Sequence, residues 1–587
     1  MLAEPSMSPT WRTASILLAL SLGLRLALLW PVLERKVEPQ YDERGYFERA
    51  KGFSAVYRHL TLGQPPSETA VRRAYGQGKW PPLHPGALGL GLFLFGTSVS
   101  AARWVVVLLS AITCPVIFVM ASKLASRRAA IIAGLLYAVY PSFLGFSHYL
   151  WSEPTYILAL LLTVNFALSI RLAETGARKL RASLLCGLFL GSSALARAAA
   201  LPFLVVIPVW LFLALREPRD RWIHSGVVSL VSVVVLLPWL LTLRAREGSF
   251  TTISTANGYN LLLGNSPGDG GDDEVKQAIR RYAREHSVHP DRAARTLAVR
   301  EILDHPARFV GSCVTHFREL WTIDVFILRH VFHLVYPPFT TAAVWWLLGA
   351  LLTSYLALLG LACWGALAGG IPAIDRGLIL ALVVVGMIPP VVSISNTRMG
   401  LPLLALLIPL AAHGWDQLRR RRPSGLRAAV IVSVLAANLV NILTLPRIFG
   451  WVPLPSSYYL GVVNPIDDLL GSRTPLTDCL RLRASPSQKA DRVTVSLIGE
   501  EYRFHGSRET ELSWQIADGR REVQLDVYSY RAENPLKMEF RSPLGYASLQ
   551  PVAREHWREW QATGLEGIEL LWCGGGRLPP AERGDPI

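Results

Sequence analysis

Charged residues are scarce in this chain. They make up 17% of its 587 residues, whereas hydrophobic residues make up 51%. A soluble protein carries charge on roughly a quarter of its residues, so this deficit argues against a soluble protein. The apolar residues gather in long blocks such as Ser15–Pro31, Leu88–Met120 and Val227–Leu243. Such blocks, without alternation of period two, predict spanning helices, which satisfy their own backbone groups in lipid.

Cysteine is also rare, and its spacing excludes the common structural zinc sites. The chain has 6 cysteines and no paired Cys-x-x-Cys pattern. Cys114, Cys186 and Cys363 fall in apolar segments, where we expect them to be small packing residues. Cys479 and Cys573 fall near the C-terminus. A disulfide between them stays open, because it depends on whether this region faces an oxidising compartment.

The chain lacks a nucleic-acid-binding motif and an internal repeat of fixed period, although it is basic. It has 59 Lys and Arg against 43 Asp and Glu, a formal net charge of +16. We attribute this surplus mainly to membrane topology and predict no nucleic-acid partner.

Hydropathy predicts an all-α polytopic membrane protein with about eleven transmembrane helices. The expected cores are 13–31, 88–120 (with an approach segment), 129–147, 155–170, 183–197, 200–215, 225–243, 341–367, 377–394, 399–415 and 427–445. We predict that the first helix is retained in the mature protein, because it contains Arg25 and lacks a small-residue cleavage site.

Basic residues predict the orientation of these helices. With eleven helices counted, the short loops rich in Lys and Arg all fall on the side of the N-terminus. They contain Arg12, Lys123, Arg127, Arg128, Arg171, Arg178, Lys179, Arg181, Arg216, Arg219, Arg221, Arg376, Arg419–Arg422 and Arg427. The positive-inside rule makes this side cytoplasmic and places the C-terminal region outside, in the periplasm.

Two domains are predicted, a transmembrane domain over 1–445 and a second domain over 446–587. Within the first, the outer loops 34–85 and 244–340 are too long for simple connectors and are expected to carry function. The second contains short runs with β-branched or alternating apolar residues, which predict a small β-rich domain, with a sandwich as one arrangement. These runs are Arg492–Gly499, Glu522–Tyr530, Lys537–Phe540 and Ile568–Cys573. No nucleophile constellation or metal cluster is recognisable in them.

Carboxylates at the outer surface are the first candidates for chemistry. Asp42 and Glu43 follow the first helix, and Glu153 opens a later one. A carboxylate at this boundary could act as a general base on an acceptor hydroxyl, or hold a divalent cation. The alternative is structural: an acidic residue at a helix N-terminus is favourable there in any case.

Cationic residues near the same surface are the second set of candidates. Lys79 precedes Trp80 and a Pro-Pro entry to the membrane, and Arg197 and Arg398 lie at outer helix ends. Guanidinium groups bind phosphate with two hydrogen bonds, so these residues could bind a lipid phosphate. They could equally be interfacial anchors, and His84 in the same entry is expected to be structural.

Several of these motifs, in this order and spacing, resemble the dolichyl-phosphate-mannose–protein mannosyltransferase family and its bacterial relatives such as the aminoarabinose transferase. The resemblance covers roughly residues 10–410. It rests on Asp42-Glu43 with Tyr46 and Ala50, Pro81-Pro82-Leu83-His84-Pro85, Arg103, Glu153-Pro154, Gly187 with Gly191 and Arg197, Asn257–Gly268 and Ile302–Pro306.

The resemblance implies a GT-C fold, a sugar donor linked to polyprenyl phosphate, and transfer with inversion at the outer face of a bacterial inner membrane. It implies that Asp42 is the general base and that Glu43 and Glu153 shape the cavity or position the acceptor or a cation. It implies further that Lys79, Arg197 and Arg398 hold the donor phosphate. The acceptor would be an envelope glycan, lipid or protein. The sequence identifies no cofactor with certainty and leaves a divalent cation open.

Two positions depart from the family pattern. Members often carry a basic residue immediately before Pro-Pro, where this chain has Trp80, with Lys79 one position back. Members often have Arg-aromatic-Arg before the late Leu-Pro, where this chain has Arg398-Met399-Gly400. These departures bear on the phosphate ligands and not on the fold.

Alternative functions are a transporter or flippase of lipid-linked glycans, a ligase or polymerase of O-antigen type, and a non-catalytic assembly scaffold. A transporter favours inverted repeats and broken helices near the middle of the membrane, and neither is recognisable. The early Asp-Glu pair argues against the ligase. A scaffold would keep its cellular role when Asp42 is replaced by asparagine, and an enzyme would not.

Overall fold

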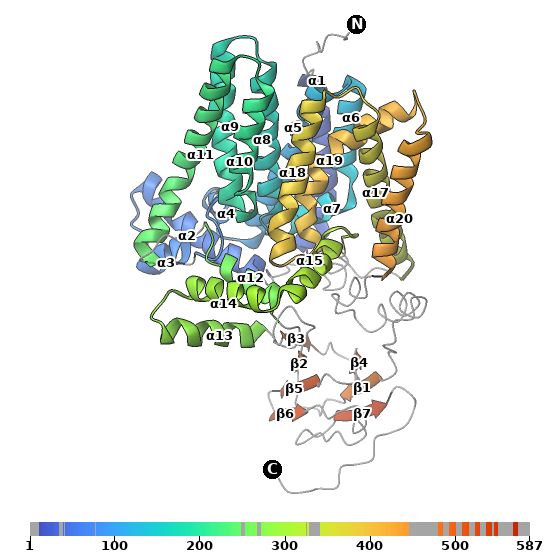
Figure 1. Ribbon diagram of the computed structural model, residues 1–587. Helices are drawn as coiled ribbons and strands as arrows, with labels where there is room; N and C mark the ends of the chain where they lie inside the picture. Colours follow the sequence, from blue (N-terminus) through green and yellow to red (C-terminus); the bar gives the residue numbers. More distant parts are fainter. Residues whose placement is uncertain are drawn as a thin grey trace. The chain divides into compact units, whose positions relative to one another are not determined.

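A computed structural model shows the fold of this protein (Figure 1). It describes residues 11–34, 39, 42–76, 78–247, 253–266, 272–324, 326–327 and 341–444, and seven strands between residues 479 and 572. The chain divides into two compact units, one built mainly of helices and the other holding the strands.

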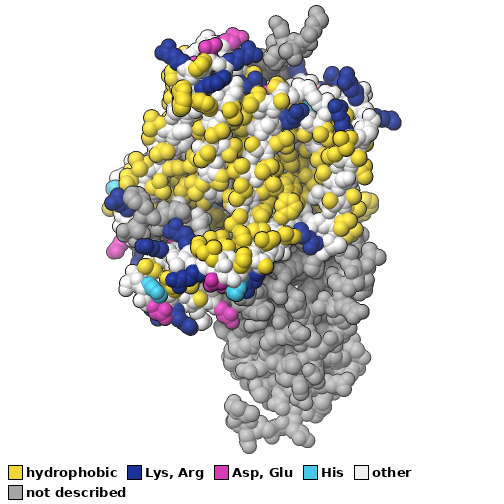
Figure 2. Space-filling view, in the orientation of Figure 1, with side chains coloured by type: hydrophobic (Ala, Val, Ile, Leu, Met, Phe, Trp, Pro, Cys, Tyr) yellow, Lys and Arg dark blue, Asp and Glu magenta, His cyan; other side chains and the backbone are white. Residues whose placement is uncertain are grey.

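The helical unit is that of a multi-pass membrane protein. Nine helices in the described part of the chain are long and apolar enough to cross a membrane. They are α1 (Trp11–Glu34), α5 (Val99–Leu124), α8 (Glu153–Leu172), α9 (Gly176–Ala196), α11 (Pro218–Glu247), α17 (Thr341–Leu367), α18 (Ala373–Val392), α19 (Thr397–Leu418) and α20 (Gly425–Thr444). Figure 2 shows hydrophobic side chains over the middle of this unit, where lipid would contact it.

The two other predicted membrane segments are broken or short. The segment 129–147 forms α6 (Arg127–Val139), α7 (Pro141–Gly145) and the 3₁₀ turn η1 (Phe146–His148), bent by 56°. The bend falls before Pro141, because a residue that precedes proline is disfavoured in the helical conformation. The segment 200–215 forms the turn η2 (Ala198–Ala200) and α10 (Phe203–Ala214), which is short for a full crossing. The prediction of a polytopic helical protein is therefore confirmed.

One predicted membrane segment contains a break. The segment 88–120, expected to be one spanning core with an approach segment, contains the short helix α4 (Leu83–Phe95) and the spanning helix α5. They separate at Gly96, whose φ of 90° is readily adopted only by glycine. Ser98 then starts α5, because its hydroxyl accepts a hydrogen bond from the amide of Ala101 at 3.1 Å.

The outer segments predicted as long loops are largely helical where the structure describes them. The first contains α2 (Asp42–Leu62) and α3 (Glu68–Tyr75). The second contains α12 (Asn257–Asn265), α13 (Asp272–Glu285), α14 (Pro290–Asp304) and α15 (Pro306–Leu320). Helix α2 packs on α4, and α15 packs on α18 and α19. Helices α2, α3, α12, α14 and α15 lie at one end of the membrane helices (Figure 1).

Buried Arg49 fixes the first of these outer segments. Its guanidinium donates to the carbonyl oxygens of Trp80 at 2.5 Å and of Ala74 at 3.0 Å. Gly52 lets α3 approach α2 closely, because a Cβ there would lie 2.5 Å from the backbone nitrogen of Ala74. Since Asp42 starts α2, these contacts also set the position of its backbone.

The described strands form two antiparallel sheets. One has the order β4-β1-β7 and the other β3-β2-β5-β6. Their bounds are β1 (Cys479–Ala484), β2 (Arg492–Gly499), β3 (Arg508–Gln515), β4 (Val523–Tyr528), β5 (Leu536–Ser542), β6 (Gly545–Leu549) and β7 (Ile568–Trp572). The four predicted runs correspond to β2, β4, β5 and β7. Cys573, one half of the disulfide left open, lies outside the described residues.

We predict that a reporter enzyme that requires the periplasm is active when fused after residue 445 and inactive when fused after Arg422. The basic run Arg419–Arg422 lies between α19 and α20, and the positive-inside rule keeps it in the cytoplasm. Assays of both fusions in intact cells measure this, with a cytoplasmic reporter at the same sites as the control. The reverse pattern would mean that the predicted orientation is wrong.

Candidate functional site

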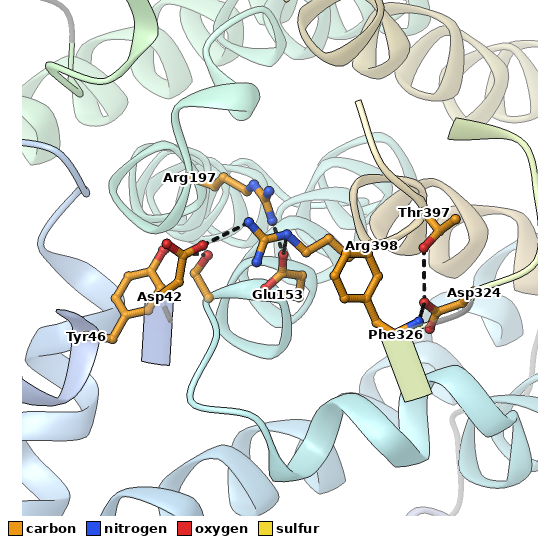
Figure 3. A network of polar contacts seen from close by, with 9 residues as sticks. Asp42, Tyr46, Glu153, Arg197, Asp324, Phe326, Thr397 and Arg398 are labelled. Carbon is orange, nitrogen blue, oxygen red and sulfur yellow. Dashed lines mark hydrogen bonds and ion pairs between the residues drawn. The ribbon is translucent and has the colours of Figure 1, made fainter. Parts of the chain in front are cut away.

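The candidate site is a cluster of two carboxylates and two guanidinium groups. Figure 3 shows the Arg398 guanidinium reaching both Asp42 and Glu153, and the Arg197 guanidinium meeting the same oxygen of Glu153. The four residues come from the ends of four helices. Asp42 starts α2, Glu153 starts α8, Arg197 follows α9, and Arg398 is the second residue of α19. Residues far apart in sequence therefore meet at one point.

Asp42 is the most exposed member of the cluster. Its Oδ2 accepts a hydrogen bond from Nη2 of Arg398 at 3.0 Å. The Asp42 side chain is 32% exposed, compared with 18% for Arg398. A carboxylate at this position can reach a hydroxyl that approaches from outside while it contacts the buried cation.

Glu153 is the buried centre of the cluster. Its side chain is 2% exposed, and Oε1 faces both guanidinium groups, with Nη1 of Arg197 as a hydrogen-bond donor and Nε of Arg398 at 3.7 Å. Oε2 is buried with no hydrogen-bond partner among the described residues. An isolated buried carboxylate is costly, and the two cations offset this cost. The two carboxylates and two guanidiniums balance in formal charge.

Local backbone geometry turns both arginines into the cluster. Arg197 ends α9 in an extended conformation, with φ −155° and ψ 128°, while its amide still donates to the carbonyl oxygen of Ser193. Arg398 lies in the first turn of α19, after Asn396 in an extended conformation. A cation is disfavoured at a helix N-terminus, and the two carboxylates around Arg398 counter that effect.

Aromatic rings enclose the Arg398 guanidinium. Its central carbon lies 4.6 Å from the Trp151 ring centroid and 6.0 Å from that of Phe326. The two rings meet edge to face, with centroids 5.5 Å apart. Cation–π contacts of this kind stabilise an arginine and limit its access to water. Electrostatic interactions within the cluster are therefore stronger than on an open surface.

Tyr46 lies one turn after Asp42. Its hydroxyl contacts Oγ of Ser152 at 3.3 Å, and its ring packs near those of Trp80 and His84. Burial, and then the neighbouring charge of Asp42, raise the pKa of Tyr46 far above its ordinary value. Tyr46 therefore stays a neutral phenol that can donate or accept a hydrogen bond.

Glu43 lies next to the cluster but has a different partner. Its side chain is buried, and Oε1 accepts a hydrogen bond from the backbone amide of Leu150 at 2.9 Å. It thereby ties α2 to the segment that leads into α8. Buried His84 supports the same segment through the hydroxyl of Thr155 at 2.8 Å and the carbonyl oxygen of Leu150 at 3.0 Å. The structural role expected for His84 agrees with these contacts.

Lys79 is not joined to the cluster by an ion pair among the described residues. Its side chain is exposed, and its ammonium lies 4.4 Å from the Trp80 ring centroid. Its backbone is fixed, because its carbonyl oxygen accepts from Oγ of Ser254 and that of Gly78 accepts from the amide of Thr255. The other two predicted cations thus lie in the cluster, while Lys79 faces outward.

Asp324 is a charged neighbour of the cluster that the sequence analysis did not single out. It is 5% exposed, and burial raises its pKa to about 6. Figure 3 shows it beside Thr397 and Phe326, with the Phe326 ring between it and Arg398. A signal was available, because Asp324 is the only charged residue between Leu320 and Ile327. A lone acid in an apolar stretch indicates a specific partner or a function.

The carboxylates of the site do not form a metal cluster in the described part of the chain. No group of three or more His, Cys, Asp or Glu there is arranged to hold a metal ion. Asp42 and Glu153 instead face guanidinium groups. A divalent cation would have to compete with Arg398 for both carboxylates.

Comparison with solved structures gives matches of low sequence identity and low TM-score. The oligosaccharyltransferase of Archaeoglobus fulgidus, solved with zinc and sulfate, is 15% identical with a TM-score of 0.43. That match covers 73% of this chain and 52% of the other, so this chain spans about half the length of that enzyme. ArnT from Cupriavidus metallidurans bound to undecaprenyl phosphate is 15% identical, with a TM-score of 0.35 and coverage of 70% and 79%.

A sequence profile gives the family resemblance directly. The profile of the dolichyl-phosphate-mannose-protein mannosyltransferase family matches residues 79–242. This segment contains Lys79, Glu153 and Arg197 and runs through most of α11. Residues 79–242 thus match the profile of the dolichyl-phosphate-mannose-protein mannosyltransferase family, the family that the sequence motifs resemble.

Proposed function

We propose that this protein is a membrane glycosyltransferase that moves a sugar from a polyprenyl-phosphate carrier to a hydroxyl of an envelope glycan, lipid or protein. The reaction takes place at the outer face of a bacterial inner membrane and inverts the anomeric carbon. Asp42 is the general base, and Arg197, Arg398 and Lys79 bind the donor phosphate. Glu153 holds the two arginines, and Glu43 braces the segment that leads to it.

The observation that carries this proposal is the direct contact between Asp42 and Arg398. A group that takes a proton from the acceptor must lie near the group that holds the leaving phosphate. The 3.0 Å hydrogen bond between Oδ2 of Asp42 and Nη2 of Arg398 provides this proximity. The match of residues 79–242 to a family named for a lipid-phosphate sugar donor supports the same reaction.

The reaction moves negative charge onto the phosphate, where the cations would act. The acceptor hydroxyl gives its proton to Asp42 while its oxygen bonds to the anomeric carbon, and the bond from that carbon to the phosphate oxygen breaks. A sugar–phosphate diester carries one negative charge, and the released polyprenyl phosphate carries up to two. Positive groups already in place stabilise this developing charge without reorganisation.

The position of Arg398 suits an anionic ligand for a second reason. It lies in the first turn of α19, where the helix dipole and free backbone amides favour a negative group. A phosphate that contacts Arg398 would gain both interactions and relieve the repulsion between the cation and the helix terminus. When no phosphate is bound, Asp42 and Glu153 supply the negative charge that balances Arg398.

Asp42→Asn is predicted to lower transfer by at least 10²-fold without unfolding the protein, as expected for loss of a general base. The measurement is mass spectrometry of envelope glycans, glycolipids and proteins from cells that lack the protein and are complemented with each variant. Glu48→Gln is the control, because Glu48 lies on the same helix, is 40% exposed and pairs with Lys51. Near-normal transfer by Asp42→Asn would remove Asp42 from the mechanism.

Arg398→Lys is predicted to reduce transfer by about 10-fold or more, although the charge is kept. A lysine cannot contact Asp42 and Glu153 from one planar group, nor bind a phosphate with two parallel hydrogen bonds. Quantifying the same product in complemented cells, together with protein abundance, tests this. Arg420→Lys is the matched control, because Arg420 follows the opposite end of the same helix. Equal transfer by both variants contradicts the assignment of Arg398.

A further inference from the structure

We propose that Asp324 is a positioning residue, which holds the Arg398 guanidinium in the orientation that binds the donor phosphate. The inference rests on the proposed function, since it takes Arg398 to be a phosphate ligand. Asp324 contacts the two groups that flank Arg398 and is expected to act through them rather than on the substrate.

One carboxylate oxygen of Asp324 connects both flanking groups. Oδ1 accepts a hydrogen bond from the backbone amide of Phe326 at 3.1 Å and from the hydroxyl of Thr397 at 3.2 Å. Thr397 immediately precedes Arg398, and the Phe326 ring flanks the guanidinium. Oδ1 of Asp324 therefore joins the first turn of α19 to the segment that carries the Phe326 ring.

The carbonyl oxygen and the ring of Phe326 are held by further contacts. Its carbonyl oxygen accepts a hydrogen bond from the hydroxyl of Tyr149 at 2.5 Å, and its ring contacts Trp151 and Phe146. Trp151 in turn stacks on Tyr149 with centroids 4.3 Å apart. Loss of the Asp324 contact removes a backbone hydrogen bond that holds Phe326, so the guanidinium gains freedom to turn away.

Packing alone does not explain an acidic residue at this position. Oδ2 of Asp324 is buried and forms no hydrogen bond of good geometry among the described residues. The Ser142 side chain is the polar group that interacts with this carboxyl besides Thr397 and the Phe326 amide. The acidic and phenolic groups that face it are Glu153 of α8 and Tyr140, which precedes α7, and the nearby Glu153 charge is repulsive. Arg398 of α19 lies beyond Thr397. A buried charge that costs stability is characteristic of functional sites, where activity and stability conflict.

The binding test uses purified full-length protein in nanodiscs with undecaprenyl phosphate as the probe and undecaprenol as the matched uncharged ligand. Asp324→Ala is predicted to weaken undecaprenyl phosphate binding by about 10-fold, the effect of one or two lost hydrogen bonds. Undecaprenol binding stays unchanged. Thr397→Val, which removes one of the contacts, is expected to have a smaller effect in the same direction.

Asp416→Asn is the control for these variants. Asp416 is a buried carboxylate near the other end of α19 that accepts a hydrogen bond from Ser126 at 2.9 Å. It should leave both ligands unaffected. Equal losses for undecaprenyl phosphate and undecaprenol in Asp324→Ala would indicate general damage to the fold and would overturn the inference.

A stability measurement tests whether the Asp324 carboxyl is buried and charged at neutral pH. Burial raises the pKa of Asp324 to about 6, so its native carboxyl binds protons that the unfolded chain releases above about pH 4. The native state therefore loses stability as the pH rises through this window. Asp324→Asn removes this loss, so its melting temperature relative to wild type should be higher at about pH 7.5 than at about pH 4.5. If the difference in melting temperature between Asp324→Asn and wild type does not change with pH, the Asp324 carboxyl is not a buried charge.

The outcomes also distinguish this inference from the proposed function. If Arg398→Lys weakens undecaprenyl phosphate binding and Asp324→Ala does not, the inference fails while the phosphate site stands. If neither variant affects binding, the assignment of Arg398 to the phosphate fails together with the inference. Selective loss of phosphate binding in both variants supports both.

Discussion

The site depends on the shared ion pairs of Glu153. This single buried carboxylate faces Arg197 and Arg398 at once, and Arg398 extends the chain of contacts to Asp42. Removal of Glu153 would leave two cations facing each other at a membrane boundary, where water screens their repulsion poorly. The positions of α2, α9 and α19 relative to α8 are therefore coupled through charge as well as through packing.

Much of the fold followed from hydropathy, because lipid imposes a strict requirement on the backbone. The nine spanning helices of the described chain, and the bent segment 129–147, lie where long apolar blocks predicted them. The breaks were less predictable. Whether Gly96 would end a helix depends on a backbone angle, and the outer segments expected as loops form helices that pack against the bundle.

Four residues of the cluster could be singled out from the sequence, but their pairing could not. Asp42, Glu153, Arg197 and Arg398 were singled out because each lies at a helix end on one side of the membrane. Which carboxylate meets which guanidinium depends on how the helices pack, and no local pattern encodes that. Lys79 was also singled out by its motif position, and its exposed side chain lies on Trp80 and forms no ion pair with the cluster among the described residues. Asp324 and Phe326 reach Arg398 only through the tertiary fold.

The contact between Asp42 and Arg398 has a consequence for the order of events. While the guanidinium neutralises Asp42, a hydroxyl that arrives early, including that of water, meets a weakened proton acceptor. A phosphate that engages Arg398 competes for the same hydrogen-bond donors and leaves Asp42 more basic. Under the proposed mechanism, binding of the carrier phosphate therefore activates the base that the transfer requires. The arginine that binds the phosphate also limits hydrolysis of the activated sugar by water.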